Sequence, residues 1–220
     1  MTPESTRRPP RIAMLHCGSH AQLATLADPA LEPHVIRPVH ARTGSATDLA
    51  DVDVVVVADR IRPDLLTPWA DALIAHAEAG GTLVVLGEND VGTWLPGARE
   101  QIRPTIFWWW RTGEDSRIRR CDTEHPAAGW FTDRALTWHY HGVLDPPEGA
   151  VSLVELHTPE GDVDGSLLYV DEVSTPGRLL VTTMDPVYHH GSGFMPGATQ
   201  LLYSVLRWAA EGHHDRHTAR

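Results

Sequence analysis

The stretch "DVDVVVVADR", residues 51–60, contains four consecutive valines and ends in an acidic and a basic residue. Such an uninterrupted β-branched run is typical of a strand that is buried on both faces, and therefore of a parallel sheet. Residues 62–81 follow with apolar side chains near helical spacing and end in two glycines, which predicts a helix. Residues 82–87, "TLVVLG", predict the next buried strand. A strand, a helix and a strand with such short joins form a right-handed crossover unit.

The flanking segments extend this unit into a sheet. Residues 11–17, "RIAMLHC", predict a buried strand, and residues 33–40, "PHVIRPVH", predict an edge strand because they contain Pro38. Four further strand patterns follow with little helix between them: residues 134–144, 150–158, 165–173 and 178–185. We therefore predict an α/β fold with a doubly wound, mostly parallel sheet and an added antiparallel segment in the second half.

We expect a single domain over residues 11–211, because no internal repeat or low-complexity linker divides the chain. A last amphipathic helix is predicted over residues 197–211, where Gly212 gives a stop signal. Residues 1–10 contain three prolines and residues 212–220 contain no apolar core, so both are predicted to be flexible termini.

Composition excludes several classes of function. The 220 residues have a formal charge of −11, which disfavours binding to nucleic acid or to an anionic membrane. All 18 basic residues are Arg, so no Schiff-base or P-loop lysine exists. The sequence shows neither an apolar run of membrane-spanning length nor a signal peptide. Two distant cysteines, Cys17 and Cys121, do not make a disulfide framework, which predicts a reduced, cytoplasmic protein.

Polar residues follow the predicted parallel strands. In open α/β sheets, ligands bind outside the carboxyl ends of the strands. That rule selects four segments, which we expect to be loops: Cys17–His20, Asp59–Arg60, Glu88–Asp90 and Asp185–His190. If the last strand rejoins the sheet in parallel, these segments converge on one edge.

Several of these residues also have a purely structural interpretation. Cys17 fits a buried, inert thiol, and Asp59 and Asp90 fit residues that satisfy turn backbone. Adjacent side chains point apart, so of His189 and His190 we expect one to face the site and the other to be structural.

A second group of histidines lies in "TWHYHG", residues 137–142. On a strand, His139 and His141 would share one face, while Trp138 and Tyr140 would share the other. This H-x-H spacing suits two ligands of a metal ion, and the third ligand would come from the Asp185–His190 segment. The alternative is a histidine pair that lines a polar cleft.

The third group is aromatic: "PTIFWWWR", residues 104–111, contains three consecutive tryptophans. A strand cannot bury all three on one face. Exposed Trp rings are surfaces that sugar rings and partner proteins use. The alternative is that these rings pack under an irregular insert.

Together these residues resemble the ThuA-like (trehalose utilisation) branch of the class I glutamine amidotransferase-like superfamily. The resemblance spans residues 11–208 and rests on four segments: residues 79–90, "HPAAGWF" at residues 125–131, residues 137–142 and "LLVTTMDPVYHHG" at residues 179–191. It implies a flavodoxin-like sheet and a ligand of the carbohydrate or polyol class.

The resemblance also tests for amidotransferase chemistry. That superfamily places a nucleophilic cysteine in a G-x-C-x-G elbow, where this chain reads "GENDVG" from residue 87. No Glu follows His189 or His190 at the expected second position. Without the thiolate there is no thioester chemistry, so we expect no glutaminase activity.

These considerations define a set of candidate site residues. The predicted catalytic residues are His189, His190, Asp185 and Glu88. The predicted ligand-binding residues are His20, Asn89, Trp109, His139, His141 and Tyr188. No cofactor is predicted, with a divalent metal at His139 and His141 as the open alternative.

Three functions remain open. The first is acid–base chemistry on a small sugar-like ligand. The second is a non-catalytic binding or assembly domain on a degenerate scaffold, in which the Trp run would form a homo-oligomer interface. The third is a metal-dependent hydrolase.

Overall fold

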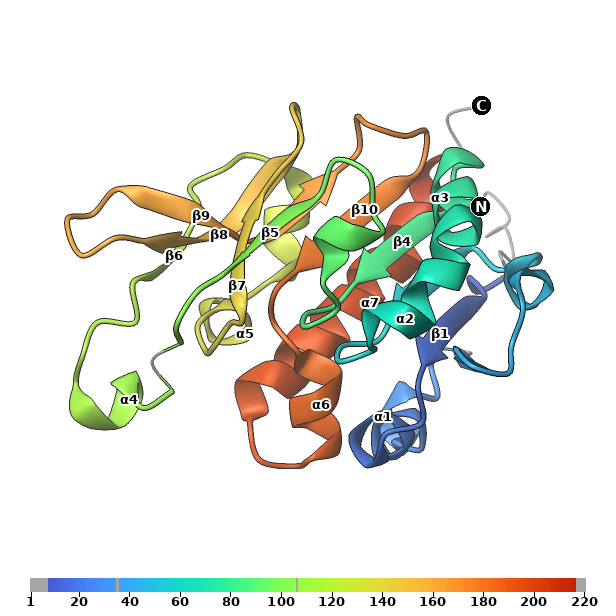
Figure 1. Cartoon of the computed structure of the whole chain (residues 1–220), viewed down its shortest axis with the longest axis horizontal. Coiled ribbons are helices and arrows are strands. Elements are labelled where there is room, and N and C mark those ends of the chain that lie inside the picture. Colours follow the sequence, from blue (N-terminus) through green and yellow to red (C-terminus); the bar gives the residue numbers. More distant parts are fainter. Residues whose placement is uncertain (1–7, 35, 106, 217–220) are drawn as a thin grey trace, which may run out of the picture.

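The computed structural model in Figure 1 describes residues 8–34, 36–105 and 107–216. Five parallel strands form one half of its sheet, in the order β2 (Ile36–His40), β1 (Ile12–His16), β3 (Val54–Val57), β4 (Thr82–Val85) and β10 (Arg178–Thr182). All side chains of β1, β3, β4 and β10 are buried, whereas β2 is a partly polar edge. This is the flavodoxin-like strand order.

The other half of the sheet is antiparallel. It contains β9 (Val163–Asp171), β8 (Val151–His157), β7 (Gly142–Asp145), β5 (Arg99–Ile102) and β6 (Ile118–Arg120). Strand β9 joins the two halves, because it pairs antiparallel with β10 and then β7 along one edge and with β8 along the other. The described residues thus form one 10-stranded sheet.

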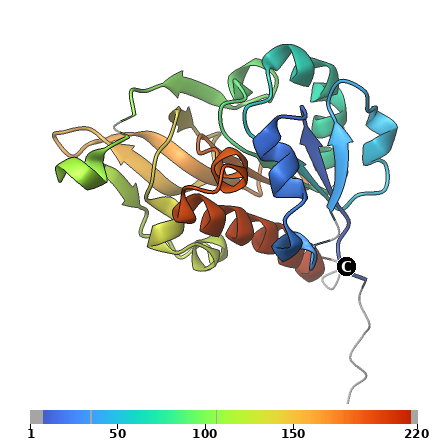
Figure 2. The same cartoon turned by 90° about the horizontal axis from the view of Figure 1, so that it is seen from below.

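Helices cover both faces of the parallel half. Helix α3 (Ala70–Glu78) lies on one face and α7 (Pro196–Arg216) on the other, as Figure 2 shows from below. The predicted helix over residues 62–81 forms as α2 (Pro63–Leu66), a 3-10 turn and α3. Pro68 interrupts it because proline has no N–H for the helical ladder. The helix end predicted at Gly212 is wrong, because α7 continues to Arg216; one glycine weakens a helix without stopping it.

Shorter helices lie at the edge drawn at the bottom of Figure 1: α1 (His20–Leu26), α6 (Pro186–Gly191) and α4 (Trp109–Thr112). Helix α5 (Asp133–Leu136) packs against α7. Further 3-10 turns occupy Pro29–Leu31, Ala46–Leu49, Thr67–Trp69, Val91–Thr93 and Pro126–Trp130. No helix in the described part of the chain is long and apolar enough to span a bilayer.

Two predictions in the second half are wrong. Residues 134–144 are not one strand: α5 is followed by irregular chain, and β7 begins only at Gly142. The side chain of Thr132 accepts the N–H of Ala135, which starts a helical turn where the apolar alternation indicated a strand. The segment after β10, which we expected to be a loop, forms α6 with Pro186 in its first turn.

Candidate functional site

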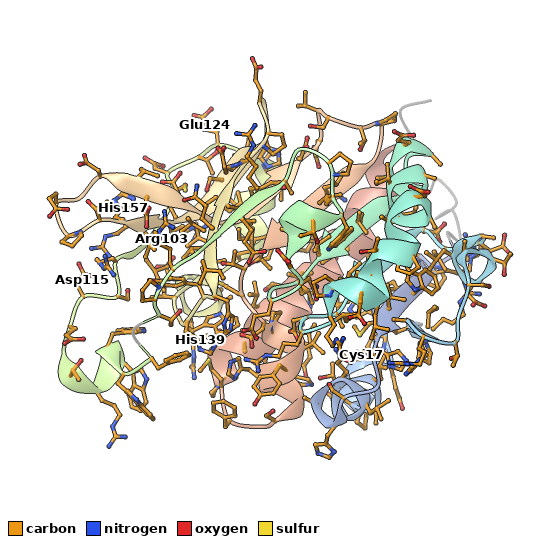
Figure 3. All side chains as sticks on the ribbon, in the orientation of Figure 1. Cys17, Arg103, Asp115, Glu124, His139 and His157 are labelled. Atoms are coloured by element: carbon orange, nitrogen blue, oxygen red, sulfur yellow. The ribbon has the colours of Figure 1, made fainter. Side chains whose placement is uncertain are left out.

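The four segments after β1, β3, β4 and β10 meet at the carboxyl edge of the sheet, as predicted. Arg60, after β3, forms ion pairs with Glu88, after β4, and with Asp185, after β10. The Sγ atom of Cys17, after β1, lies 3.8 Å from the carbonyl oxygen of Arg60. Figure 3 labels Cys17 and His139 along this edge.

Asp185 is the centre of the site, and its side chain is fully buried. Three imidazole Nε2 atoms lie close to its Oδ1 atom: 3.2 Å for His139, 3.1 Å for His141 and 3.3 Å for His189. Its other oxygen, Oδ2, accepts from the guanidinium of Arg60 at 2.7 and 2.9 Å. We call His139, His141, His189 and Asp185 the imidazole cluster.

The start of α6 explains why the Asp185 carboxylate is available. Asp185 holds the N-cap position of α6, but its side chain makes no capping hydrogen bond. Asp59 caps the helix instead, accepting the N–H of Val187 at 2.7 Å and that of Tyr188 at 3.1 Å. A buried carboxylate after β3 thereby satisfies the helix N-terminus and leaves Asp185 to the imidazoles.

Glu88 and Arg60 form the exposed rim of the site. Both have left-handed backbone, with φ of 56° for Glu88 and 59° for Arg60, which is uncommon for residues other than glycine. Their side chains are each 35% exposed and pair at 2.7 Å. The Arg60 guanidinium also stacks on the ring of Tyr188, 3.6 Å from its centroid. Glu88 is therefore a carboxylate of this site that solvent and ligands can reach.

Proton affinities in the site follow from burial and charge. Burial opposes a charge on His141, but the carboxylates of Asp185 and Glu88 outweigh it and raise the pKa of His141 to about 9. Burial also opposes ionisation of Asp185, yet the three imidazoles hold the pKa of Asp185 far below its usual range. Burial lowers the pKa of His139. Burial, and then the charge of Asp185, raise the pKa of Asp59.

Aromatic rings enclose the imidazoles. Trp138 makes edge contacts with His139 and His189, at centroid distances of 5.1 and 5.6 Å. Phe107 contacts His139 at 5.2 Å, and Phe194 contacts His189 at 4.8 Å. The run of aromatic residues that begins at Phe107 therefore starts beside the cluster, and it continues into α4.

The side chains of that run are not packed under an insert. Trp108 and Trp110 are 57% and 62% exposed, and Phe107 is 54% exposed. Trp109, the predicted ligand-binding residue, is half-buried between them. The exposed rings, Phe107, Trp108 and Trp110, form what we call the aromatic segment.

The two adjacent histidines point apart, as expected. The Nε2 atom of His189 lies 2.7 Å from that of His139, inside the cluster. His190 instead bonds Thr199 at 3.0 Å and Asp28 at 2.9 Å, on the side of α7. The cluster thus includes His189 and not His190, which the sequence had proposed as an alternative catalytic residue.

Only some of the other predicted ligand-binding residues lie in the site. His139 and His141 are in the cluster, although on irregular chain, and Tyr188 supports Arg60. Asn89 is buried and bonds the backbone of Ile61, Ala58 and Leu86, so its polar atoms are occupied by structural contacts. His20 is exposed at the first residue of α1.

Two triads of potential metal ligands share Asp185: His139, Asp185 and His189, and Glu88, His141 and Asp185. Within each triad the donor atoms lie within 4.8 Å of one another. Sequence reasoning proposed His139 and His141 as candidates, with a third ligand from the segment after β10.

Sequence reasoning assigned no role to three residues that shape the site. Arg60 was placed at the edge only by its position after β3, and Phe107 and Phe194 were not selected. Phe194 lies in the same glycine-rich stretch as His189, but a ring contact across a turn leaves no pattern in the sequence. Both cysteines are free thiols.

No family model and no curated protein matches the sequence. Solved structures match it over most of its length. A Thermoplasma acidophilum protein described as part of a GMP synthase has a TM-score of 0.60 and 10% identity over 96% of this chain and 98% of that chain. A ThuA-like protein from Bacteroides uniformis has a TM-score of 0.53 and 14% identity over 94% of both chains.

An exo-β-1,4-mannosidase from an Opitutaceae bacterium has a TM-score of 0.51 and 14% identity, over 92% of this chain and 36% of that chain. At such low identities these matches show the fold alone. The chain has the α/β, flavodoxin-like fold of class I glutamine amidotransferase-like proteins, with antiparallel strands in its second half, and this confirms the predicted fold class.

Proposed function

We propose that this protein is an enzyme that binds a small hydroxylated ligand of the carbohydrate or polyol class at the carboxyl edge of its sheet. Glu88 exchanges a proton with the ligand. The imidazole cluster behind Glu88 fixes the position of its carboxylate relative to the ligand. The proposal places the protein in the cytoplasm, which suits its two free thiols.

The strained ion pair of Glu88 and Arg60 carries the proposal. Left-handed backbone at a non-glycine residue is unfavourable and is retained mostly where function requires it. Here two such residues, at the ends of adjacent strands β3 and β4, present their side chains to each other. Their pairing places an accessible carboxylate beside a buried network of three imidazoles and a second carboxylate. Such a concentration of titratable groups is typical of active sites.

The same position argues against glutaminase chemistry. The resemblance places the elbow cysteine in the turn after β4, where this chain has Glu88 and Asn89, so this strained turn offers no thiolate. Cys17 lies at the end of a different strand, and its Sγ is 3.3 Å from Gln22 Oε1. We expect no release of ammonia from glutamine by the wild-type protein. Release that a Cys17→Ala variant abolishes would contradict this.

Three observations support a hydroxylated ligand. Carboxylate and guanidinium groups on the rim bind hydroxyls through charge-assisted hydrogen bonds. The aromatic segment offers exposed ring faces next to the cluster, as sugar-binding sites do. The fold is shared with a ThuA-like protein and with part of a mannosidase.

A ligand panel tests the proposal. Saturation-transfer NMR would measure binding of aldoses, ketoses, disaccharides, sugar acids and polyols to the wild type, to Glu88→Gln and to Glu78→Gln. Glu78 is a matched control, because it is exposed at the end of α3, away from the site. We expect at least one ligand whose binding Glu88→Gln weakens about tenfold and Glu78→Gln leaves unchanged. The proposal fails if no ligand in the panel binds or if both variants behave alike.

One observation favours the second candidate, a non-catalytic assembly domain. Large exposed rings mark interfaces, and Trp108 and Trp110 are more than half exposed. Light scattering after size exclusion separates the candidates. An interface predicts a larger species that Trp110→Ala dissociates, whereas a ligand-binding role predicts the same mass for both proteins and weaker ligand binding by the variant.

A further inference from the structure

We propose that His139, His189 and Asp185 bind one divalent transition-metal ion, and that His141 and Glu88 line the open side of this site. This inference deepens the proposed function, because it adds a metal ion to the same site. It rests on the proposed function only for what the ion does in turnover, and binding of the ion is tested separately.

Donor spacing is the first argument. A tetrahedral ion with bonds of about 2.0–2.1 Å to nitrogen and oxygen holds its donors about 3.3 Å apart. The Nε2 atoms of His139 and His189 lie 3.2 and 3.3 Å from Asp185 Oδ1. They lie 2.7 Å from each other. These three donors therefore lie close enough together for one ion to contact all of them, with the fourth position left for solvent or ligand.

Unsatisfied atoms are the second argument. Asp185 Oδ1 is buried and has no hydrogen-bond partner among the described residues, although the Nε2 atoms of His139 and His189 lie within 3.3 Å of it. Buried polar atoms are nearly always paired. An ion bound between this oxygen and the two imidazoles would satisfy it.

Proton positions give a third argument. Two imidazole nitrogens at 2.7 Å can share one proton but cannot each carry one toward the other. At least one of His139 and His189 therefore directs a nitrogen lone pair into the cluster. Such an unprotonated nitrogen is the form of imidazole that binds a metal ion.

The neighbouring side chains hold the proposed ligands in place. Glu88 Oε1 lies 3.0 Å from Nδ1 of His141, whose Nε2 lies 3.1 Å from Asp185 Oδ1. The second oxygen of Asp185 is held by Arg60 at 2.7 Å. Phe107 and Phe194 pack against the imidazoles. The site opens at Glu88 and Arg60, so an ion can enter and a ligand can reach it.

The donor set selects the class of ion. Imidazoles suit zinc, iron, cobalt, nickel and copper, whereas magnesium and calcium prefer oxygen donors. Two imidazoles and one carboxylate therefore favour Zn²⁺ and its spectroscopic substitute Co²⁺ over Mg²⁺.

Cobalt titration of the untagged full chain tests the proposal. His213, His214 and His217 are replaced by Ala to remove competing ligands near the carboxyl terminus, and chelation removes metal beforehand. We expect visible d–d absorption that saturates at one Co²⁺ per chain, with Kd of about 1 µM or tighter, displacement by Zn²⁺ and no response to Mg²⁺. Absence of saturable binding overturns the proposal, and this readout needs no cluster variant to fold.

Variants locate the ion. His139→Ala and His189→Ala each remove a ligand, and we expect at least 100-fold weaker binding. Glu88→Gln leaves all three ligands in place, and we expect cobalt binding to change by less than about tenfold. His190→Ala is the matched control, because His190 adjoins His189 in sequence but points away; its affinity should equal that of the parent. Circular dichroism confirms folding, and equal Kd for His139→Ala and parent would overturn the assignment.

The two proposals fail differently. No cobalt binding together with ligand binding that depends on Glu88 overturns the metal site and leaves the proposed function. One bound ion with no ligand in the panel leaves the metal site and overturns the proposed function.

Discussion

Asp185 shows how a single buried carboxylate is kept charged. Its side chain is fully buried, and burial alone would protonate it. Arg60 and three imidazoles supply the compensating positive and polar groups, while Asp59 takes over the capping of α6. The site therefore depends on two aspartates 126 positions apart: Asp59 caps α6, and Asp185 contacts the imidazoles.

Removing that charge should destabilise the protein. Asp185→Asn keeps the shape of the side chain but leaves Arg60 without its buried partner, so the free energy of unfolding in the presence of chelator should fall by about 3 kcal/mol. Asp64→Asn breaks an exposed pair with Arg62, whose side chains are 57% and 77% exposed, and should have little effect. Urea unfolding measures both, and equal losses would contradict this account of Asp185.

A second carboxylate predicts a pH dependence. Asp28 accepts the N–H of Ala30 and the hydroxyl of Tyr203, and these bonds lower the pKa of Asp28. Because the folded pKa is the lower one, the stabilisation is present above the ordinary pKa of about 4 and is lost as pH falls through the folded value.

Asp28→Asn should therefore be less stable than wild type near pH 6, and the difference should shrink as the pH falls below about 4. Urea unfolding across this range measures it. A difference that stays constant or grows on acidification would show that Asp28 does not act through its charge.

Residue roles were predictable where they follow from local geometry. That His189 and His190 point apart follows from their adjacency, and the position of Glu88 follows from the strand before it. The capping role of Asp59 was not predictable, because its partners lie 128 and 129 positions away. The position of Asn89 at the edge suggested a ligand, but its amide bonds backbone in the interior.

At the scale of elements, the turn after β4 stores strain. Glu88 has left-handed backbone, and Gly87 before it approaches the carbonyl oxygen of Thr183 so closely that no Cβ would fit. The turn therefore fixes a glutamate in a conformation that glycine would adopt freely.

Paired substitutions isolate this strain. Glu88→Ala and Glu88→Gly remove the same carboxylate and differ in the penalty for positive φ. We expect Glu88→Gly to be more stable than Glu88→Ala by about 1 kcal/mol in chemical unfolding. If Glu88→Ala is equally stable or more stable, the turn is not strained as described.

Strands were predictable from the sequence where one hydrophobic periodicity dominates. The valines of β3 and the apolar run of β4 have no helical alternative of that length, and both formed as predicted. The alternation in "TWHYHG" indicated a strand, yet the imidazoles of His139 and His141 reach Asp185 from irregular chain. In this segment, side-chain interactions with Asp185 take the place of the backbone hydrogen bonds of the strand that the alternation suggested.

At the scale of the whole molecule, β9 and α7 join the parallel and antiparallel halves. Strand β9 is hydrogen-bonded to β10 along its second half, and one buried core continues through both halves. Helix α7 packs on α5 and α6 and contacts β4. This continuity is why no composition boundary divides the sequence.

Unfolding should therefore be a single cooperative event. Calorimetry should give one transition with a calorimetric to van't Hoff enthalpy ratio of about one. Leu180→Ala, a fully buried change in β10, should lower the stability of both halves together, by about 2–5 kcal/mol. Two separate transitions, or a loss confined to one half in hydrogen exchange, would contradict one cooperative domain over residues 11–211.

The most direct test of the site as a whole is a crystal structure of the wild-type protein grown with Zn²⁺ and the tightest ligand of the panel. We predict an anomalous zinc peak about 2.0–2.2 Å from the Nε2 atoms of His139 and His189 and from the Asp185 carboxylate, and ligand density in contact with the Glu88 carboxylate. A map with no peak among the imidazoles and ligand density away from Glu88 would contradict the account.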